Sequence, residues 1–252
     1  MTSARRPGLL RIITFWMNNL TKQLIKDGFA IIEDIYTANE VKSIIAAINK
    51  ADQSRNTFRK TSDLFAIRRF LSEVPGVKEL IFTDGLKAVV DGLFGSGYAA
   101  VKSIYFDKPG QSNWFVAWHQ DLTIAVDKKL ELPGYTNWTF KLNQYAVQPP
   151  LNVLQNNFTI RIHLDDTNEG NGALRVIRGS HHKKVCRVES IDWQTEIETV
   201  CGVKSGGIMI MRPLLMHASN RTTTNKKRRV IHVEFSRAEL PDGIEWAEKC
   251  TC

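Results

Sequence analysis

The chain has 252 residues, 43% of them hydrophobic and 24% charged, which suits one large globular domain or two small ones. No apolar run approaches the roughly 18–20 residues of a membrane span, so we expect no membrane association. The net charge of +8 is partly concentrated in residues 226–229, but no nucleic-acid-binding motif accompanies that run. The expected partner is a small organic molecule and not a nucleic acid, and the basic balance favours an anionic one.

Neither the N-terminus nor the cysteines indicate secretion. Arg11 interrupts the apolar stretch near the N-terminus, and no small-residue cleavage site follows it. We therefore interpret residues 1–16 as a disordered or misassigned extension, with a targeting segment as the alternative, and residues 17–252 as a single domain. The four cysteines show no Cys-x-x-Cys spacing, and a chain of this length needs no disulfide bonds. A reducing, cytoplasmic setting fits this pattern best.

The N-terminal part of the domain is predicted to be mainly helical. Apolar residues recur at helical spacing from Met17 until Gly28 ends the helix, and residues 29–35 then read as a strand. Thr37 is followed three residues later by a glutamate, which is a capping box that starts a second amphipathic helix. A third helix is predicted over residues 77–94.

From Tyr98 onward, short apolar segments alternate with turns, and no long helix is evident between them. This order argues against a parallel βαβ sheet and predicts a β-sandwich or jelly roll with helices packed outside it. Residues 122–157 form a long, poorly patterned insertion, and long loops of this kind often carry substrate contacts or lids. The strands are expected at residues 101–106, 114–119, 158–164, 173–177, 207–211 and 230–235.

The segment Trp118-His119-Gln120-Asp121 follows one of these strands and contains a candidate for half of a metal site. Residues i and i+2 of a strand face the same side, so His119 and Asp121 project together while Gln120 points away. His217, between two late strands, is the best candidate for a third ligand. Two histidines and one carboxylate form the facial triad that leaves positions on Fe(II) open for a cosubstrate and dioxygen. The spacing alone is not specific, since a single histidine is more often structural.

Arg228 and Ser219 are candidates for holding a dicarboxylate cosubstrate. Such a molecule needs a fixed, bidentate cation at its far end, and arginine suits this role better than lysine. Ser219, two residues after His217, could donate a hydroxyl to the same carboxylate. Arg229 competes with Arg228 because neighbouring strand residues face opposite ways. The alternative for Arg228 is a solvated place in the basic run.

Several segments of the chain, taken together, resemble one family. They are His119-Gln120-Asp121, His217-Ala218-Ser219, Arg228, Gly170-Asn171-Gly172-Ala173-Leu174 and Gly179-Ser180-His181. From about Thr21 to Trp246 the chain is similar to the phytanoyl-CoA dioxygenase family of iron(II)/2-oxoglutarate oxygenases. The resemblance implies a double-stranded β-helix with flanking helices. It also implies that His119, Asp121 and His217 bind Fe(II), and that Arg228 and Ser219 hold the distal carboxylate of 2-oxoglutarate, with dioxygen as the other cosubstrate.

The chain departs from the family pattern at two places. Arg161 stands where some relatives place a tryptophan beside the cosubstrate, on a strand face that is otherwise polar as well. Arg161 could help to bind 2-oxoglutarate or an anionic substrate, and a buried Arg161–Asp165 ion pair would explain the pattern equally well. A lysine that some relatives use upstream has no secure match, with Arg68 and Arg69 as the candidates. Asp121 itself argues against halogenation, since related halogenases carry a small residue there to make room for chloride.

Three functions are consistent with these residues. The first is an Fe(II)- and 2-oxoglutarate-dependent oxygenase that hydroxylates a small organic substrate and releases succinate and CO2. The second is a catalytically inactive jelly-roll binding module that retains the metal site. The third is hydrolysis with zinc, which two histidines and an aspartate can bind, but it leaves the Arg228–Ser219 pair without a purpose and ranks last.

Overall fold

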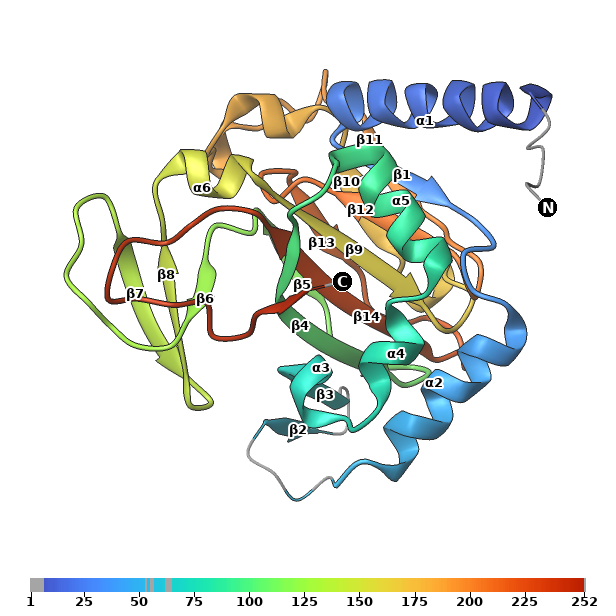
Figure 1. Cartoon of the computed structure of the whole chain (residues 1–252), viewed down its shortest axis with the longest axis horizontal. Coiled ribbons are helices and arrows are strands. Elements are labelled where there is room, and N and C mark those ends of the chain that lie inside the picture. The colour runs from blue at the N-terminus through green and yellow to red at the C-terminus, as the bar shows by residue number, and fades with distance from the viewer. Residues whose placement is uncertain (1–6, 53, 55–56, 62–64, 252) are drawn as a thin grey trace, which may run out of the picture.

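The computed structural model describes residues 7–52, 54, 57–61 and 65–251, and its centre is a sandwich of two antiparallel sheets (Figure 1). The larger sheet contains, in spatial order, β1 (Phe29–Ile32), β12 (Ile208–Met211), β9 (Asn157–His163), β14 (Arg228–Ser236), β4 (Ala99–Lys108), β3 (Phe65–Arg68) and β2 (Phe58–Lys60), with β15 (Cys250–Thr251) paired to β4. The smaller sheet contains, in spatial order, β11 (Glu198–Cys201), β10 (Leu174–Ile177), β13 (His217–Ser219) and β5 (Val116–His119). The predicted jelly roll with helices outside it is confirmed.

Helices cover the outer face of the larger sheet, as Figure 1 shows. The helices are α1 (Pro7–Asp27), α2 (Ala38–Lys50), α3 (Phe70–Glu73), α4 (Val77–Ile81), α5 (Asp84–Phe94) and α6 (Leu151–Gln155), with 3-10 turns at η1 (Glu169–Asn171), η2 (Ser180–Lys183) and η3 (Val188–Ser190). Thr37 and Glu40 form the predicted capping box at the start of α2. The single helix predicted over residues 77–94 is instead two, because Thr83 adopts an extended conformation and caps α5 by accepting a hydrogen bond from the Leu86 N–H.

The chain is helical from Pro7, before the start expected at Met17. Residues 1–6 lie outside the described part of the chain, and an extension over residues 1–16 stays a prediction. None of the helices that the structure describes is long and apolar enough to cross a membrane.

Strand alternation divides the larger sheet into an apolar and a polar face. On β9, Ile160 and Ile162 belong to the same core cluster as Ile44 and Leu86 of the covering helices. The intervening Arg161 therefore points the other way, toward the smaller sheet. β14 repeats this arrangement: the residues that share the apolar cluster are Ile231, Val233 and Phe235, and those facing the smaller sheet are Arg228, Val230, His232 and Glu234. The space between the sheets is consequently lined by polar side chains on one side.

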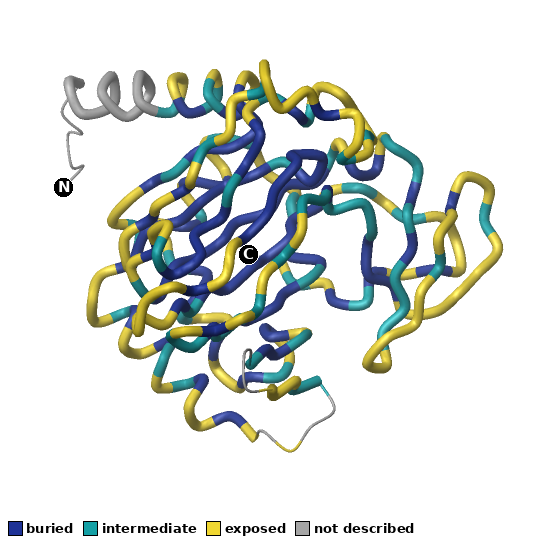
Figure 2. Tube along the Cα trace, turned by 180° about the vertical axis from the view of Figure 1, so that it is seen from behind, coloured by how far each residue is buried: buried dark blue, intermediate teal, exposed yellow. Residues whose placement is uncertain are grey.

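Residues 122–157 are not a loop but a third, three-stranded sheet followed by α6. Its spatial order is β6 (Ile124–Val126), β8 (Gln144–Gln148) and β7 (Thr136–Lys141). The strands and the C-terminal segment share a core cluster, and Val126 pairs with Trp246 in an isolated bridge. Figure 2 shows that much of this sheet is exposed, unlike the buried centre of the sandwich. The segment is thus a structured unit beside the sandwich.

We predict that the aromatic stack beneath the helices dominates the stability of the fold. The Phe158 ring is fully buried and lies parallel to Phe94, with ring centroids 3.6 Å apart, and to Phe235, at 5.0 Å. Phe158→Ala should lower the free energy of unfolding by about 3–5 kcal/mol in denaturant titrations, since it removes buried area and leaves a cavity. Phe140→Ala, at a ring that is 55% exposed, should change it by less than about 0.5 kcal/mol. Equal effects of the two substitutions would contradict this account of the core.

Candidate active site

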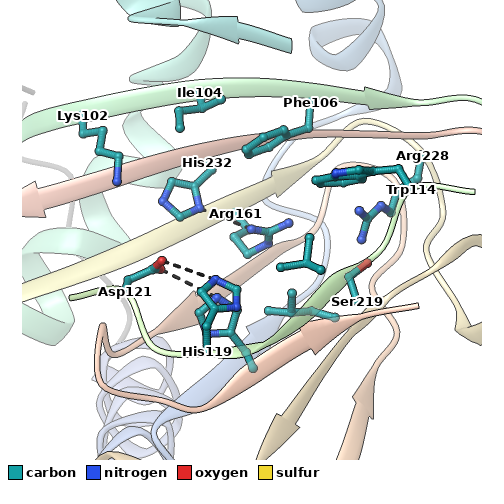
Figure 3. Close-up of a pocket in the computed structure, with 13 residues that line it drawn as sticks. Lys102, Ile104, Phe106, Trp114, His119, Asp121, Arg161, Ser219, Arg228 and His232 are labelled. Atoms are coloured by element: carbon teal, nitrogen blue, oxygen red, sulfur yellow. Dashed lines mark hydrogen bonds and ion pairs between the residues drawn. The ribbon is translucent and has the colours of Figure 1, made fainter. Parts of the chain in front are cut away.

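A pocket of about 220 Å³ lies between the two sheets (Figure 3). Both sheets contribute to its walls, which contain all six residues predicted for the site. The lining residues are Lys102, Ile104, Phe106, Trp114, Val116, His119, Asp121, Arg161, Leu174, His217, Ser219, Arg228 and His232. The smaller sheet supplies the two predicted histidine ligands, and the larger sheet supplies the arginines.

The predicted triad assembles where β5 and β13 pair. His119, the last residue of β5, lies opposite His217, the first residue of β13, and their ring centroids are 4.2 Å apart. Asp121 follows β5, and its backbone N–H donates to the carbonyl oxygen of Pro213 at 2.9 Å. The Asp121 carboxylate lies 3.9 Å from His119 Nε2 and 3.8 Å from His217 Nε2. One ligand atom from each of the three side chains falls within 4.8 Å of the others, which is close enough to share one metal ion.

Hydrogen bonds to the backbone fix the tautomers of both histidines. His119 Nδ1 lies 2.8 Å from the carbonyl oxygen of Ala117, and His217 Nδ1 lies 2.8 Å from that of Leu215. A carbonyl oxygen only accepts, so each Nδ1 carries the proton and donates it. In the neutral form of each ring, Nε2 then carries the lone pair, and this atom lies beside the Asp121 carboxylate. This is the tautomer in which an imidazole binds a metal through Nε2.

The neighbours of Asp121 keep its carboxylate ionised. Burial opposes ionisation, but the interactions with His217 and, after it, with His232 and the cationic Lys102 hold the pKa of Asp121 below its ordinary value. Its Oδ2 atom is buried and has no hydrogen-bond partner in the described part of the chain. Burial lowers the pKa of His217 to about 4, although Asp121 opposes that shift, so the His217 imidazole is neutral. A buried anionic oxygen without a donor, beside the neutral His217 imidazole and the Nε2 atom of His119, is a donor set that fits a divalent metal.

A second group of three potential ligands, Asp121, His232 and Glu234, fits a metal less well. Arg161 can only donate, so its contact of 3.3 Å makes His232 Nδ1 an acceptor. His232 Nε2 then carries the proton and donates to Glu234 at 3.1 Å. Glu234 also pairs with Lys102 at 2.5 Å. Because both His232 nitrogens are engaged, this imidazole has no lone pair left for a metal, in contrast to the two histidines of the triad.

Arg228 and Ser219 converge on a single carbonyl at one end of the pocket. The Arg228 guanidinium and the Ser219 hydroxyl both donate to the carbonyl oxygen of Gly172, the latter at 3.0 Å. Gly172 has a φ of +75°, and a Cβ there would lie 2.6 Å from the carbonyl oxygen of Asn220, so only glycine fits this turn. Burial and the neighbouring Arg161 lower the pKa of Arg228, but a guanidinium remains charged at neutral pH.

The structure separates the competing arginines. Arg229 turns away from the pocket and forms a two-point ion pair with Asp165, at 2.8 and 2.6 Å. The alternative of an Arg161–Asp165 ion pair is therefore wrong, and Arg161 points into the pocket beside His232. Arg68 opens onto a neighbouring cavity, and Arg69 precedes α3 near Glu248.

Several residues at the site were not predicted from the sequence. A row of interacting side chains, Lys102–Glu234–His232–Arg161, joins three strands. The pairing of β14 with β4 places Glu234 opposite Lys102, and its pairing with β9 places His232 opposite Arg161. Polar residues alternate along β14, and that alternation was a usable signal for Glu234.

Gln120, expected only to point away from the triad, is buried and forms three hydrogen bonds. Its side-chain amide donates to the carbonyls of Lys184 and Leu214 and accepts from the Cys186 N–H.

Comparisons with known proteins place the chain in a family. The family model for phytanoyl-CoA dioxygenase (PhyH) matches residues 24–230. No curated protein matches the chain. One similar solved structure is the epimerase SnoN in complex with Fe3+, alpha ketoglutarate and nogalamycin RO, with 12% identity and a TM-score of 0.67 over 94% of this chain and 95% of that one. A second is EctD from S. alaskensis in its apoform, with 21% identity and a TM-score of 0.67 over 86% of this chain and 76% of that one. A third is HygX from Streptomyces hygroscopicus with nickel, 2-oxoglutarate and hygromycin B, with 15% identity and a TM-score of 0.63 over 89% of this chain and 88% of that one.

The solved structures share the double-stranded β-helix fold, and the family model identifies the class of enzyme. The protein is an iron(II)- and 2-oxoglutarate-dependent oxygenase that uses dioxygen. Within that class, the chain belongs to the phytanoyl-CoA dioxygenase family.

We predict that the side-chain hydrogen bonds of Gln120 hold the neighbouring triad residues in position. Gln120→Ala removes one hydrogen bond to Leu214, before β13, and two to Lys184 and Cys186, between η2 and η3, so His119 and Asp121 should lose their fixed orientation. Metal affinity, measured by competition with a chelator, should fall by about tenfold or more, as for other residues that orient metal ligands. Gln194→Ala, at an exposed position, is the control and should leave the affinity unchanged. Wild-type metal affinity in the folded Gln120 variant would show that this side chain does not position the ligands.

Proposed function

We propose that His119, Asp121 and His217 hold the iron and that the enzyme hydroxylates a small organic substrate. The observation that carries this proposal is the convergence of His119 Nε2 and His217 Nε2 on the Asp121 carboxylate, whose buried Oδ2 has no hydrogen-bond donor among the described residues. Two histidines and one carboxylate on one side of an ion leave the opposite positions for ligands other than the protein. The presence of Asp121 supports oxidation and not halogenation.

Two arginines would bind the two ends of 2-oxoglutarate. Arg228 and Ser219 lie together at one end of the pocket and suit the distal carboxylate, with Arg228 as the charge-assisted donor. To contribute, Ser219 would turn its hydroxyl from the Gly172 carbonyl toward that carboxylate. Arg161 is buried nearer to the triad, and its Nε has no partner within the described residues. It suits the carboxylate at the metal end of the cosubstrate.

The remaining residues would position the reactants and keep water out. The bound iron supplies dioxygen activation, which couples oxidative decarboxylation of 2-oxoglutarate to succinate and CO2 with oxidation of a substrate C–H bond. The apolar side chains of Ile104, Phe106, Trp114 and Leu174 form pocket walls that exclude water from this chemistry. His232, held between Arg161 and Glu234, keeps Arg161 in place.

We also infer a cytoplasmic setting and a small-molecule partner. The cysteines of the described residues, at positions 186, 201 and 250, are all free, which supports a reducing compartment. The pocket of about 220 Å³ suits part of a small molecule better than a macromolecule.

The arginine assignment predicts opposite results for two adjacent residues. Arg228→Gln should raise the Kd for 2-oxoglutarate by about tenfold or more, since it removes a buried charge partner. Arg229→Gln loses an ion pair on the other face of the same strand and should leave this Kd unchanged. Calorimetric titration of the metal-loaded proteins measures both values. The reverse order would assign the cosubstrate to Arg229.

The triad assignment predicts loss of metal and of turnover together. His217→Ala should lose the bound Fe(II), the visible charge-transfer band formed with 2-oxoglutarate under anaerobic conditions, and succinate formation in air. His182→Ala, at an exposed histidine, is the control and should retain all three. A wild-type protein that produces neither the band nor succinate would overturn the proposal. Iron binding that survives His217→Ala would place the metal elsewhere.

A further inference from the structure

A second cavity, of about 110 Å³, lies beside the candidate active site. It is lined by residues of the larger sheet and of the three-stranded sheet: Arg68, Lys102, Thr123, Ile124, Ala125, Thr139, Lys141, Gln144 and Ala146. Lys102 lines both cavities and stands between them. The two cavities are therefore neighbours that share the Lys102 side chain as a wall. We call it the cationic cavity, after Arg68, Lys102 and Lys141.

Among the residues that the structure describes, the charges of the cationic cavity are only partly balanced by carboxylates. Lys102 is paired with Glu234 at 2.5 Å. Arg68 is partly buried and has no acidic partner among the residues that the structure describes, and its pKa is lowered by burial and by the nearby Arg59. Lys141 adds a third cation at the open side. A guanidinium that is partly removed from water without a counter-ion gains most from an anionic ligand that it can bind at two points.

The other partly buried arginines of the sheets differ from Arg68 because each is paired with a carboxylate. Arg229 is paired with Asp165, and Arg175 is paired with Glu198 at 2.5 and 2.7 Å. Arg161 and Arg228 are buried and have no carboxylate partner among the described residues, and both line the pocket where an anionic cosubstrate would bind. Arg68 resembles the second group in lacking a carboxylate, so the same reasoning applies to it.

The cationic cavity lies at the opposite end of the site from Arg228. Along the β4–β14 pair, Arg228 lies opposite Lys108, whereas Glu234 lies opposite Lys102. Six residues of strand separate the two ends, or about 20 Å at about 3.3 Å per residue. Figure 3 shows Lys102 at the left, on the side of Asp121, and Arg228 at the right. A ligand in the cationic cavity would thus approach the triad from the side that the cosubstrate leaves open.

We propose that the cationic cavity binds the anionic end of the substrate. The inference rests on the proposed function, and it names the substrate class: a small organic molecule with a carboxylate or phosphate group at one end and the oxidised carbon near the triad. Arg68 would be the main anchor, with Lys102 and Lys141 beside it. The hydroxyls of Thr123 and Thr139 and the amide of Gln144 add neutral donors. The three-stranded sheet would then form one wall of the substrate site.

Anion binding can be measured before the substrate is known. The protein is loaded with zinc in place of iron and saturated with 2-oxoglutarate, so that Arg161 and Arg228 are occupied and no turnover occurs. Acetate and sulfate, as probes for a carboxylate and a phosphate, are then titrated while backbone amide NMR signals are followed. We expect saturable shifts at Lys102, Ile124 and Ala146, and the probe that binds more tightly identifies the anionic group.

Substitutions separate the cavity from general charge effects. Arg68→Gln should weaken binding of the preferred probe by about tenfold or more, because it removes a charge-assisted, two-point contact. Arg68→Lys keeps the charge and should retain part of the affinity. Lys141→Gln, at an exposed strand end where folding is not affected, should have a smaller effect in the same direction. Lys42→Gln, at an exposed position on α2, is the matched control and should have none.

The same spectra keep this inference separate from the proposed function. Binding of 2-oxoglutarate is read from the Gly172 and Ser219 amides, and its absence would contradict the proposed function. Normal 2-oxoglutarate binding with no saturable shift around the cationic cavity, or with equal probe affinity in wild-type and Arg68→Gln proteins, would overturn the inference alone.

Discussion

The site depends on two hydrogen bonds from histidine rings to the backbone. His119 donates to the carbonyl of Ala117, and His217 donates to that of Leu215, each two residues earlier in the chain. A backbone carbonyl cannot exchange donor and acceptor roles, so the strand conformation itself selects the tautomer. Both lone pairs then face Asp121 without any help from a second side chain. Pairing of β5 with β13 brings the two rings together, and Gln120 ties the same segments from behind.

The larger sheet contributes a polar face to the pocket, and the positive charges on this face are only partly paired with carboxylates. Lys102, Glu234, His232 and Arg161 form a chain in which each donor meets one acceptor, and this chain holds Arg161 in a fixed position. It leaves Arg161, Arg228 and Arg68 without carboxylate partners among the described residues. A buried cation without a partner is costly. Anionic ligands at both ends of the pocket would remove that cost, which links the folding of this face to what the enzyme binds.

Much of this arrangement could be predicted from local sequence patterns. The capping box at Thr37 depends on residues three apart, and the polar face around Arg161 follows from alternation alone. Both patterns carry their structural meaning within a few residues. The triad required combining a His-x-Asp pair with a distant histidine, and the sequence alone could not choose between Arg228 and Arg229. That choice depends on Asp165, which pairs with Arg229 across two strands.

What could not be predicted depends on long-range register or on weak patterns. The Lys102–Glu234 ion pair joins residues 132 positions apart, and no local signal connects them. β7 is mostly exposed on both faces, so it lacks the alternation that marks a half-buried strand. The sequence of this three-stranded sheet consequently resembles that of a long loop. The sequence gives no sign of the break between α4 and α5, because the apolar pattern continues through Phe82, while Thr83 adopts the conformation of a helix cap.

The most direct test of the account is a crystal structure of the protein grown anaerobically with Fe(II) and 2-oxoglutarate. The account predicts an anomalous iron peak at about 2.0–2.2 Å from the Nε2 atoms of His119 and His217 and from an Asp121 carboxylate oxygen. It also predicts the distal carboxylate of 2-oxoglutarate on Arg228. Iron bound by His232 and Glu234, or a distal carboxylate that contacts another arginine, would contradict it.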